Sequence, residues 1–413
     1  MEMYKNLNKY KIIFLLVIFV FLLIWLLCYI LYGKSITPWA LYPPFADVIT
    51  ITGSVDCMSH GFDPYTVTVF DPWGRTFCYP PIWINIFSFF CLDKSATNYI
   101  GIIYIILFYI FTLFSLKIED IKNMLIYLFL FLSPPILLLI ERGNSDIILY
   151  FIVIISLFYL RSNSESDKNF KVYISYGLIL FASLLKLYPI ILISLIIYEK
   201  IAIKHKIIIS STVIITFLLY VFSSDFIVHV LTNVAKSSFS SYGSNIILIF
   251  FFNLKNSFII SFVLSIIVFF IAIIINLKFK EKIFNIINVD GLKDRRYYNL
   301  FLAGMIIFCG TFVIGSNWNY RFVFLLITIP YFLEMIKQKN DNNLKYLIVL
   351  IFCILYGTLC VSVIRHIAPY KEIFYAALVF QHLLTWILYF IFSMILINQL
   401  SIIRNVNLFF DRN

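Results

Sequence analysis

The sequence predicts an all-α fold: a polytopic transmembrane helical bundle that forms a single integral membrane domain over residues 1–413. Two observations predict this class. Hydrophobic residues make up 62% of the chain and charged residues only 13%, whereas water-soluble domains carry about 25% charge. Apolar runs long enough to cross a hydrocarbon core of roughly 30 Å as helices also recur along the whole length.

The first apolar stretch, Lys11 to Tyr32, is predicted to be a retained membrane span that follows a basic N-terminal segment. It is too long for the apolar core of a signal peptide, and it lacks a small-residue cleavage site. With its N-terminal side in the cytoplasm, residues 33–80 form an extracytoplasmic loop subdomain. The Pro, Gly, Asp and aromatic content of this loop predicts short helices that lie on the membrane surface.

The later spans follow from the basic loops, because cytoplasmic loops are enriched in Lys and Arg. Basic residues gather at 161–171, 199–206, 278–298 and 337–345, which are therefore predicted to be cytoplasmic. The last four spans then cover about 299–315, 320–336, 345–364 and Ile373 to Leu400. The net charge is +11, but the basic residues are spread over short loops and do not form one patch. This distribution argues against a nucleic-acid partner.

Two apolar stretches, Pro81 to Leu92 and Tyr188 to Tyr198, are too short to span a membrane untilted, and each has a proline at or near its start. Non-helical backbone at membrane depth occurs only where it is buried in protein or lines a wet cavity. We therefore expect broken or re-entrant helices at these places, and about 10 to 13 membrane segments in total.

Asp47 is the candidate catalytic residue. It lies in the first outer loop, where an unpaired carboxylate can act as general base for an acceptor hydroxyl. A helix cap or a surface charge is the alternative for this residue. Asp63, which precedes Pro64, is assigned to a turn.

Further polar residues collect on the side predicted to face outward, in ERGNSD (141–146) and GSNWNYR (315–321). In the first of these, Asn144 can instead cap the next helix, and Glu141 and Arg142 can pair with each other. Lys186 lies in an apolar stretch, where an ionisable side chain costs about 2.5 to 3.5 kcal/mol. It therefore needs a partner or a cavity, unless it snorkels to the interface.

Cys57 and Cys78 both lie in the first outer loop, where a disulfide between them is plausible. Such a bond contributes roughly 3 kcal/mol through loop closure. The other five cysteines lie in or beside apolar segments and are expected to be small packing residues.

Several motifs are absent: there is no P-loop or dinucleotide glycine motif, no His/Cys cluster with zinc spacing and no nucleophile elbow. We therefore expect no cofactor and no metal. An outward-facing membrane enzyme without a nucleotide site needs an activated substrate that arrives through the bilayer. A polyprenyl-phosphate sugar meets this need, and its phosphate would be bound by Arg or Lys near the interface.

The order of Asp47, GFDPY (61–65), CYPP (78–81), ERGNSD, LLKLYP (184–189) and GSNWNYR resembles the C-superfamily multispanning glycosyltransferases. It is most similar to the polyprenol-phosphate-mannose-dependent mannosyltransferases and their uncharacterised bacterial relatives, over residues 40–330. The resemblance implies metal-free, inverting transfer of a hexose or pentose from a polyprenyl-phosphate sugar donor. The acceptor would be a cell-envelope glycan, a glycolipid or another lipid-linked molecule, on the extracytoplasmic face of a bacterial plasma membrane.

Residue by residue, the resemblance implies Asp47 as general base, or Asp56 if the loop aligns differently, and Lys186 on the donor phosphate. The other substrate-binding candidates lie in these motifs and in the last outer loop: Tyr65, Tyr79, Arg142, Asn144, Tyr188, Trp318, Tyr320, Arg321 and His366. The mannosyltransferases have a Ser-Trp-acid-His run where this chain has Asn317 to Tyr320. This departure leaves the sugar open and makes Arg321 a second candidate for the donor phosphate.

Two other functions stay open. One is an O-antigen-type polymerase, which is also outward-facing and arginine-dependent, but its large second outer loop is not evident here. The other is a lipid-sugar flippase or transporter without chemistry, which predicts polar residues at the bilayer midplane and an inverted repeat. The polar residues instead gather at the outer boundary, and no repeat is visible.

Overall fold

The computed structural model describes residues 8–32, 42–160, 168–199, 201–223, 226–233, 240–252, 257–278, 295–339, 342–367 and 371–410. Within these ranges the chain is almost entirely helical, and the one pair of strands joins β1 (Ser241–Tyr242) to β2 (Asn317–Trp318). The predicted all-α class is therefore confirmed. The chain forms two compact units.

Eight helices of the described residues are long and apolar enough to cross a membrane. A ninth span results if α5 (Ile121–Phe131) and α6 (Pro134–Arg142), which are bent by 55°, form one broken span. The eight segments are Lys9–Cys28, Lys94–Leu113, Ile203–Phe222, Ser257–Lys278, Tyr297–Ile314, Asn319–Gln338, Asn343–Arg365 and Lys371–Leu400. The protein is a multi-pass membrane protein, and its first span and last four spans lie where the sequence pattern predicts them.

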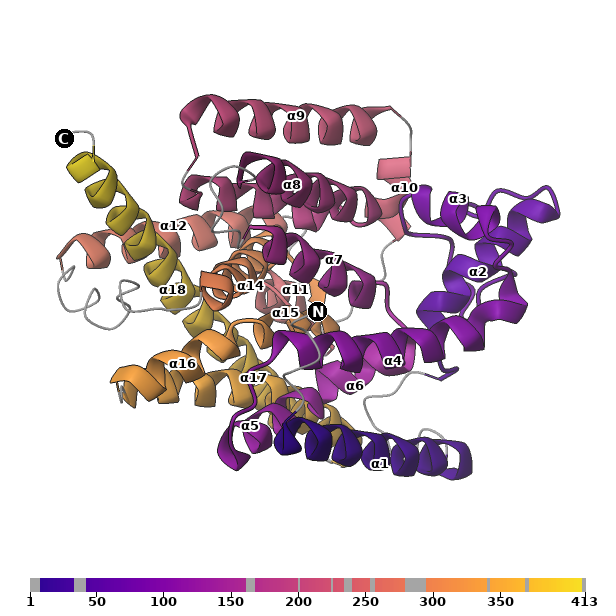
Figure 1. The fold of residues 1–413 in the computed structure, drawn as a ribbon. Helices are drawn as coiled ribbons and strands as arrows, with labels where there is room; N and C mark the ends of the chain where they lie inside the picture. Colours follow the sequence, from indigo (N-terminus) through magenta and orange to yellow (C-terminus); the bar gives the residue numbers. More distant parts are fainter. Residues whose placement is uncertain are drawn as a thin grey trace. The chain divides into compact units, whose positions relative to one another are not determined.

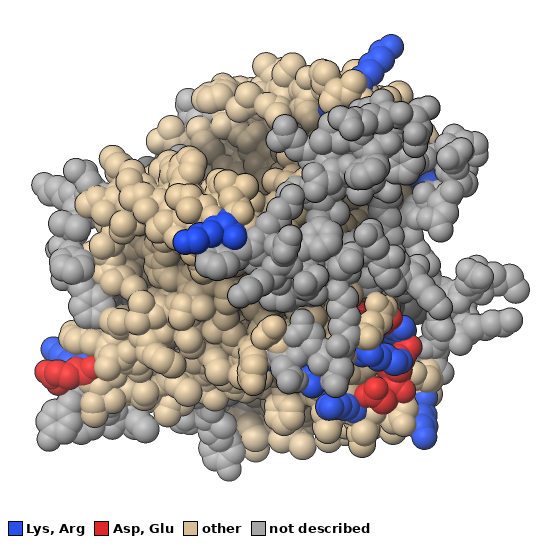
Figure 2. Space-filling model, turned by 90° about the vertical axis from the view of Figure 1, so that its left-hand side faces the viewer, with Lys and Arg blue, Asp and Glu red and all other residues tan. Residues whose placement is uncertain are grey.

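The surface agrees with a lipid environment. Figure 2 shows a face on which charged side chains form a few patches and most of the other described surface is uncharged. On α1 (Lys9–Tyr32), the side chains of Leu16 and Phe19 are 58% and 65% exposed. Large apolar side chains exposed in rows are a liability in water but are well solvated by lipid chains.

The first unit contains residues 1–154, 180–187 and 215–235. Its complete described helices are α1, α2 (Ala46–Ser59), α3 (Ile82–Phe89), the short η3 (Lys94–Ala96), α4 (Thr97–Ser115), α5, α6 and α10 (Phe226–Asn233). It also holds the start of α7 (Asp146–Tyr159), the end of α8 (Lys168–Leu185) and the second part of α9 (Ile203–Phe222). Within it, α2 packs against α3, α4 and α6, as the right-hand part of Figure 1 shows for α2 and α3.

The second unit contains residues 155–179, 188–214 and 236–413. Its complete described elements are η4 (Tyr188–Tyr198), β1, α11 (Ile246–Phe252), α12 (Ser257–Lys278), α14 (Arg295–Ile314), β2, η5 (Asn319–Phe322), α15 (Val323–Leu326), α16 (Ile329–Lys339), α17 (Asn342–Ile367) and α18 (Lys371–Phe410). The long helix α18 packs against α12, α14 and α17, and α14 also packs against η4. Its core is rich in aromatic rings, such as Phe301 stacked on Tyr331.

The two stretches predicted to be broken are indeed short helical pieces. The first contains α3, whose eight residues follow Pro81, and the second forms the eleven-residue 3₁₀ helix η4, with Pro189 at its second position. Because proline lacks a backbone N–H and cannot continue an α-helix, α8 ends at Leu185 before Pro189. This break puts Lys186 at the carboxyl end of α8.

The predicted loop subdomain, residues 33–80, is described from residue 42 onward, and its main element is α2. Nine of the fourteen residues of α2 are buried, so this helix is packed into the first unit instead of lying freely on a surface. Turns follow it. Asp63 accepts a hydrogen bond from the backbone N–H of Tyr65 at 3.0 Å, which confirms the predicted turn.

Candidate functional site

The amino end of α2 is held in an uncommon backbone conformation. Phe45 has φ 58°, in the left-handed region that a bulky residue rarely adopts. Its ring fills the space above Gly101 and Gly143, where an added Cβ would lie 2.4 Å and 3.2 Å from ring atoms. Its N–H also donates to the carbonyl of Glu141 at 2.6 Å. Strain of this kind persists where the surroundings over-determine it, and here it places Asp47 in the first turn of α2.

Asp47 lies at the centre of a buried polar network. Its Oδ2 accepts hydrogen bonds from Nε of Arg142 at 2.8 Å and from Nδ2 of Asn144. Its Oδ1 pairs with Nη2 of Arg142 and, at 3.4 Å, with Nη1 of Arg75. The side chains of Asp47 and Arg142 are each only 3% exposed, so this is a bidentate ion pair removed from water.

The segment that supplies Arg142 and Asn144 is shaped by local helix chemistry. Helix α6 begins with Pro134 and Pro135, which suit the first turn. It ends at Arg142, whose charge suits a helix carboxyl end, and Gly143 follows with φ 56°. The Asn144 side chain accepts from the N–H of Asp146 at 2.9 Å and so caps α7.

Lys186 joins the same network from the end of α8. Its Nζ donates to Oδ1 of Asp146 at 2.7 Å and to Oδ1 of Asn144 at 3.0 Å. Asn144 therefore bridges the two charged groups: its amide nitrogen donates to Asp47 and its amide oxygen accepts from Lys186. The Lys186 ammonium also lies 5.3 Å from the Tyr79 ring centre. The predicted partner of Lys186 exists, and it is Asp146 together with Asn144.

Asp71, Trp73 and Arg75 also belong to this site, although the sequence pattern assigned them no role in it. Arg75 donates through Nη2 to Asp71 Oδ2 at 2.8 Å and also contacts Asp47. The guanidinium groups of Arg75 and Arg142 lie 4.4 Å and 4.7 Å from the Trp73 ring centre. The i, i+4 spacing of Asp71 and Arg75 and the DPWGR sequence were the available signals. We call these residues the Asp47 cluster: Asp47, Asp71, Trp73, Arg75, Arg142, Asn144, Asp146 and Lys186.

The expectation of an unpaired carboxylate at position 47 is wrong. In the folded chain, Asp47 has two arginine partners and an amide donor. Burial by itself would raise the pKa of Asp47, but the charges of Arg142 and Arg75 outweigh it and lower the pKa to about 2. The alternative pairing of Glu141 with Arg142 does not describe the main contact either, because Arg142 makes its bidentate pair with Asp47.

These ion pairs predict a defined loss of stability in acid. The folded pKa of Asp47 lies below its ordinary value of 3.8, so the contribution is fully present above pH 5 and is lost as the pH falls toward 2. A shift of this size corresponds to roughly 2 kcal/mol. Thermal unfolding of the detergent-purified protein should therefore occur at lower temperature as the pH falls from 5 to 3. Asp47→Asn should show a smaller drop, and an equal drop would contradict this account.

Gly143 is expected to be required at its position. An added Cβ would lie 2.7 Å from Cγ2 of Val48, and φ 56° is costly for any other residue. Gly143→Ala should therefore destabilise the protein by about 1–3 kcal/mol, measured as a lower unfolding temperature. Gly177→Ala is the matched control, because nothing lies within 4 Å of the added Cβ in α8 and alanine favours helix. Equal stabilities for the two variants would contradict the prediction.

Three further candidates of the first unit, Asp56, Tyr65 and Tyr79, are not members of the Asp47 cluster. Asp56 lies nine residues after Asp47 on α2, hence on the opposite face of the helix, and its Oδ2 accepts from the N–H of Lys94 at 3.4 Å. The Tyr65 hydroxyl donates to the carbonyl of Tyr79 at 2.9 Å, so Tyr65 links two parts of the loop that are 14 residues apart in the chain. Tyr79 is in contact with the Asp47 cluster through Lys186.

Cys57 and Cys78 are both free thiols, so the plausible disulfide is not formed. Cys57 lies on α2 and is 1% exposed. Burial raises the pKa of Cys78 to about 11, and the charges of Arg75 and Asp47 also act on this thiol. The two residues belong to different parts of the loop, one in α2 and one in the irregular segment before α3.

The remaining candidates lie in the second unit and form a group of their own. The Arg321 guanidinium lies 4.5 Å from the Tyr188 ring centre and donates to Oδ1 of Asn317. The rings of Trp318 and Tyr320 are parallel within 5°, with centres 6.1 Å apart. His366 belongs to α17, but its side chain lies outside the described part. The structure thus gathers Tyr188, Trp318, Tyr320 and Arg321 around β2 and η5.

The Asp47 cluster is a buried network of paired charges. Three carboxylates, from Asp47, Asp71 and Asp146, balance the cations Arg75, Arg142 and Lys186. Among the described residues, no group of three or more His, Cys, Asp or Glu side chains is arranged to hold a metal ion.

Comparison with known families finds no model that matches the chain, and comparison with curated proteins finds no match.

Proposed function

We propose that this protein is a glycosyltransferase that moves a sugar from a polyprenyl-phosphate donor to an envelope glycan, a glycolipid or a lipid-linked acceptor. The observation that carries the proposal is the Asp47 cluster: a buried carboxylate beside one lysine and two arginines, in a multi-pass membrane protein. A lipid-borne phosphodiester would bring to such a site the negative charge that these cations recognise. The reaction would take place on the extracytoplasmic face of a bacterial plasma membrane.

The proposed step is a single inverting displacement. The acceptor hydroxyl gives its proton to the Asp47 carboxylate, and its oxygen forms a bond to the anomeric carbon. The bond from that carbon to the phosphate oxygen breaks, and its electron pair leaves with the polyprenyl phosphate. The leaving phosphate gains negative charge, which Arg142 and Lys186 stabilise.

The arginine pairs also bear on the basicity of Asp47. A carboxylate held by Arg142 is a weak base, because protonation would break the ion pair. When Arg142 turns part of its hydrogen-bonding capacity to the donor phosphate, the carboxylate loses that stabilisation and its pKa rises. Donor binding would thereby prepare the base, which links the two substrates in the proposed mechanism.

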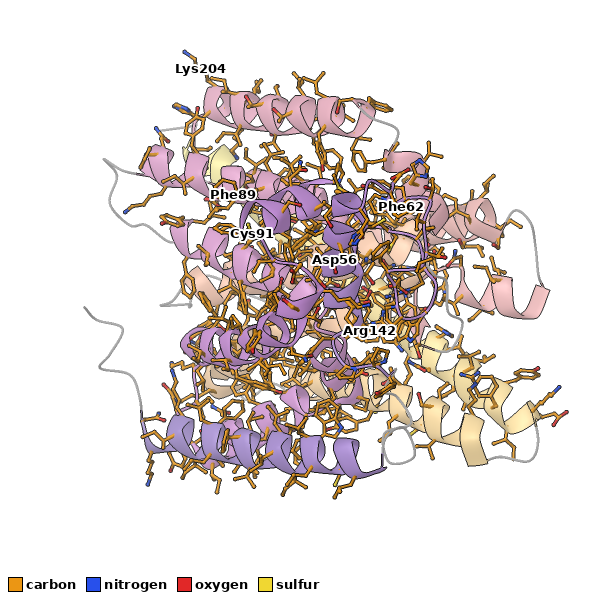
Figure 3. The ribbon with its side chains drawn as sticks, turned by 90° about the vertical axis from the view of Figure 1, so that its right-hand side faces the viewer. Asp56, Phe62, Phe89, Cys91, Arg142 and Lys204 are labelled. Atoms are coloured by element: carbon orange, nitrogen blue, oxygen red, sulfur yellow. The ribbon has the colours of Figure 1, made fainter. Side chains whose placement is uncertain are left out.

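Reconstitution tests this function directly. The purified protein in liposomes should move label from one of a panel of undecaprenyl-phosphate hexoses or pentoses to a glycolipid acceptor from the native membrane. Lys204→Gln, at an exposed position (Figure 3), should retain this activity. Two results would contradict the proposal. One is no transfer from any donor. The other is labelling of Val69→Cys by an impermeant maleimide only after cell lysis, in a chain whose seven native cysteines are replaced by serine.

A further inference from the structure

A small pocket opens beside the Asp47 cluster, within the first unit. It lies between α2 and the loop that follows, and its empty space is about 210 Å³ including the open mouth. The innermost part has room for a single water-sized group. Gly53 makes this arrangement possible, because an added Cβ there would lie 2.6 Å from the Phe70 carbonyl oxygen. We call this hollow the α2 pocket.

One wall of the α2 pocket is a stripe of α2 that begins at Asp47. Thr50, Ser54 and Cys57 line the pocket, and they follow Asp47 at intervals of three, seven and ten residues. These intervals place all four side chains on one face of a helix. With a rise of about 1.5 Å per residue, Thr50 and Ser54 lie about 5–10 Å along the axis from Asp47. A molecule in the pocket is therefore one to two helical turns from the proposed base.

The opposite wall combines a charged pair with aromatic rings. Asp71 and Arg75 line the pocket together with Phe70 and Phe77. The Asp71 side chain is 5% exposed and that of Arg75 is 19% exposed. Burial opposes ionisation of Asp71, but hydrogen bonds from Arg75 outweigh it, so the pKa of Asp71 is lowered. The walls are therefore polar and charged, yet neutral in sum.

Hydrogen-bonding capacity remains for a ligand. Arg75 carries five N–H donors, and its Nη1, with two hydrogens, has one long contact of 3.4 Å to Asp47. Ser54 donates its hydroxyl hydrogen to the Thr50 carbonyl at 2.6 Å, which leaves both oxygen lone pairs able to accept. A ligand that both donates and accepts would satisfy the two groups.

A neutral hydroxyl-bearing group fits this chemistry best. An anion would meet the Asp71 carboxylate, and a purely apolar group would remove polar side chains from water without replacing their hydrogen bonds. A sugar residue offers hydroxyls that donate and accept, and its C–H faces can pack against Phe70 and Phe77. Arg75 connects the pocket to Asp47 Oδ1, whereas Lys186 reaches Asp47 through Asn144.

We propose that the α2 pocket is the acceptor subsite and holds one hydroxyl-bearing sugar residue of the acceptor, one to two helical turns along α2 from the base Asp47. The proposal rests on the proposed glycosyl transfer, but its binding test does not. The ligand inserts one hydroxyl or hydroxymethyl group into the narrow inner part, between Ser54 and Arg75. The rest of the molecule lies in the mouth, toward Val67.

The binding test uses thiols placed at the rim. Val67 lines the pocket and is half-buried, whereas Val69 is 84% exposed and is not part of the lining. Val67→Cys and Val69→Cys, both in a background in which the seven native cysteines are replaced by serine, are treated with N-ethylmaleimide in nanodiscs. The reactions contain methyl glucoside, methyl mannoside, methyl galactoside, methyl xyloside, cyclohexylmethanol or inorganic phosphate. At least one glycoside should slow labelling of Val67→Cys about fivefold or more, as expected for roughly 1 kcal/mol, without affecting Val69→Cys. Protection by phosphate alone, by cyclohexylmethanol alone or by nothing overturns the proposal.

The kinetic test fills the pocket. Ser54→Phe should lower the rate of transfer to the native acceptor at least about tenfold. The rate at which water hydrolyses the donor should not change, because the groups proposed to bind the donor are unchanged. Val55→Phe, one residue along α2 and outside the lining, should retain both activities. Equal transfer by Ser54→Phe and Val55→Phe overturns the acceptor subsite, while an active wild type keeps the glycosyltransferase proposal. If a glycoside slows labelling of Val67→Cys but the protein transfers sugar from no donor, the pocket binds a sugar and the proposed glycosyltransferase function is wrong.

Discussion

Asp47→Asn is expected to lower the rate of glycosyl transfer by about 10² to 10⁴-fold, the usual contribution of a positioned general base. Asparagine keeps the size of the side chain but cannot accept the acceptor proton at neutral pH. The assay is transfer of labelled sugar from undecaprenyl phosphate in liposomes, normalised to folded protein measured by size-exclusion chromatography. A folded Asp47→Asn variant that transfers at the wild-type rate would remove Asp47 from the mechanism.

The same substitution is expected to reduce stability, which needs its own control. Arg142 is 2% exposed, and removal of its carboxylate partner leaves a buried charge at a cost of about 3–5 kcal/mol. Adding Arg142→Gln should recover most of the lost stability, because the pair is then removed as a whole. Transfer should not recover. Recovery of both together would show that Asp47 acts through folding alone.

Lys186→Met should have the second large effect, again on two properties. It leaves the Asp146 carboxylate, which is 0% exposed, without the ammonium that donates to it at 2.7 Å. We expect a loss of about 3–5 kcal/mol in stability, seen as a lower unfolding temperature. Binding of undecaprenyl phosphate should weaken about 10- to 100-fold, the range of a charge-assisted hydrogen bond.

A double variant separates these two effects of Lys186. Lys186→Met together with Asp146→Asn removes the buried pair and should recover most of the stability. Lipid-phosphate binding should stay weak if Lys186 contacts the donor. Lys204→Met, at an exposed position, serves as the charge control. If the double variant binds undecaprenyl phosphate as tightly as the wild type, the role of Lys186 is purely structural.

The sequence pattern identified several residues of the Asp47 cluster but not the partners with which they pair. Asp47 was singled out by its place in the first loop, Arg142 and Asn144 by the polar turn ERGNSD, and Lys186 by the cost of a charge in an apolar stretch. The structure brings these four together. Their partners could not be deduced, because Asp47 and Arg142 are 95 residues apart in the chain. Arg75 was assigned no role for a related reason: in sequence it is one charged residue in a loop, and only folding brings it to Asp47.

Backbone geometry also decides where Asp56 and the two loop cysteines lie. Asp56 and Asp47 were interchangeable in the motif pattern, but the helical phase of α2 sends them to opposite faces. Cys57 and Cys78 share a loop, yet no bond forms between them. Neither fact follows from composition, because a loop sequence does not state where its helix begins. The left-handed Phe45, wedged against Gly101 and Gly143, sets that start.

The amino-acid sequence by itself determined that this protein is an all-helical, multi-pass membrane protein, because long apolar segments satisfy their backbone hydrogen bonds in lipid only as helices. It also placed the helix breaks at prolines, a local effect of the missing N–H. Only the tertiary structure decided which charges meet. The pairing of Asp47 with two arginines, and its link through Asn144 to Lys186, depends on contacts between helices far apart in the chain.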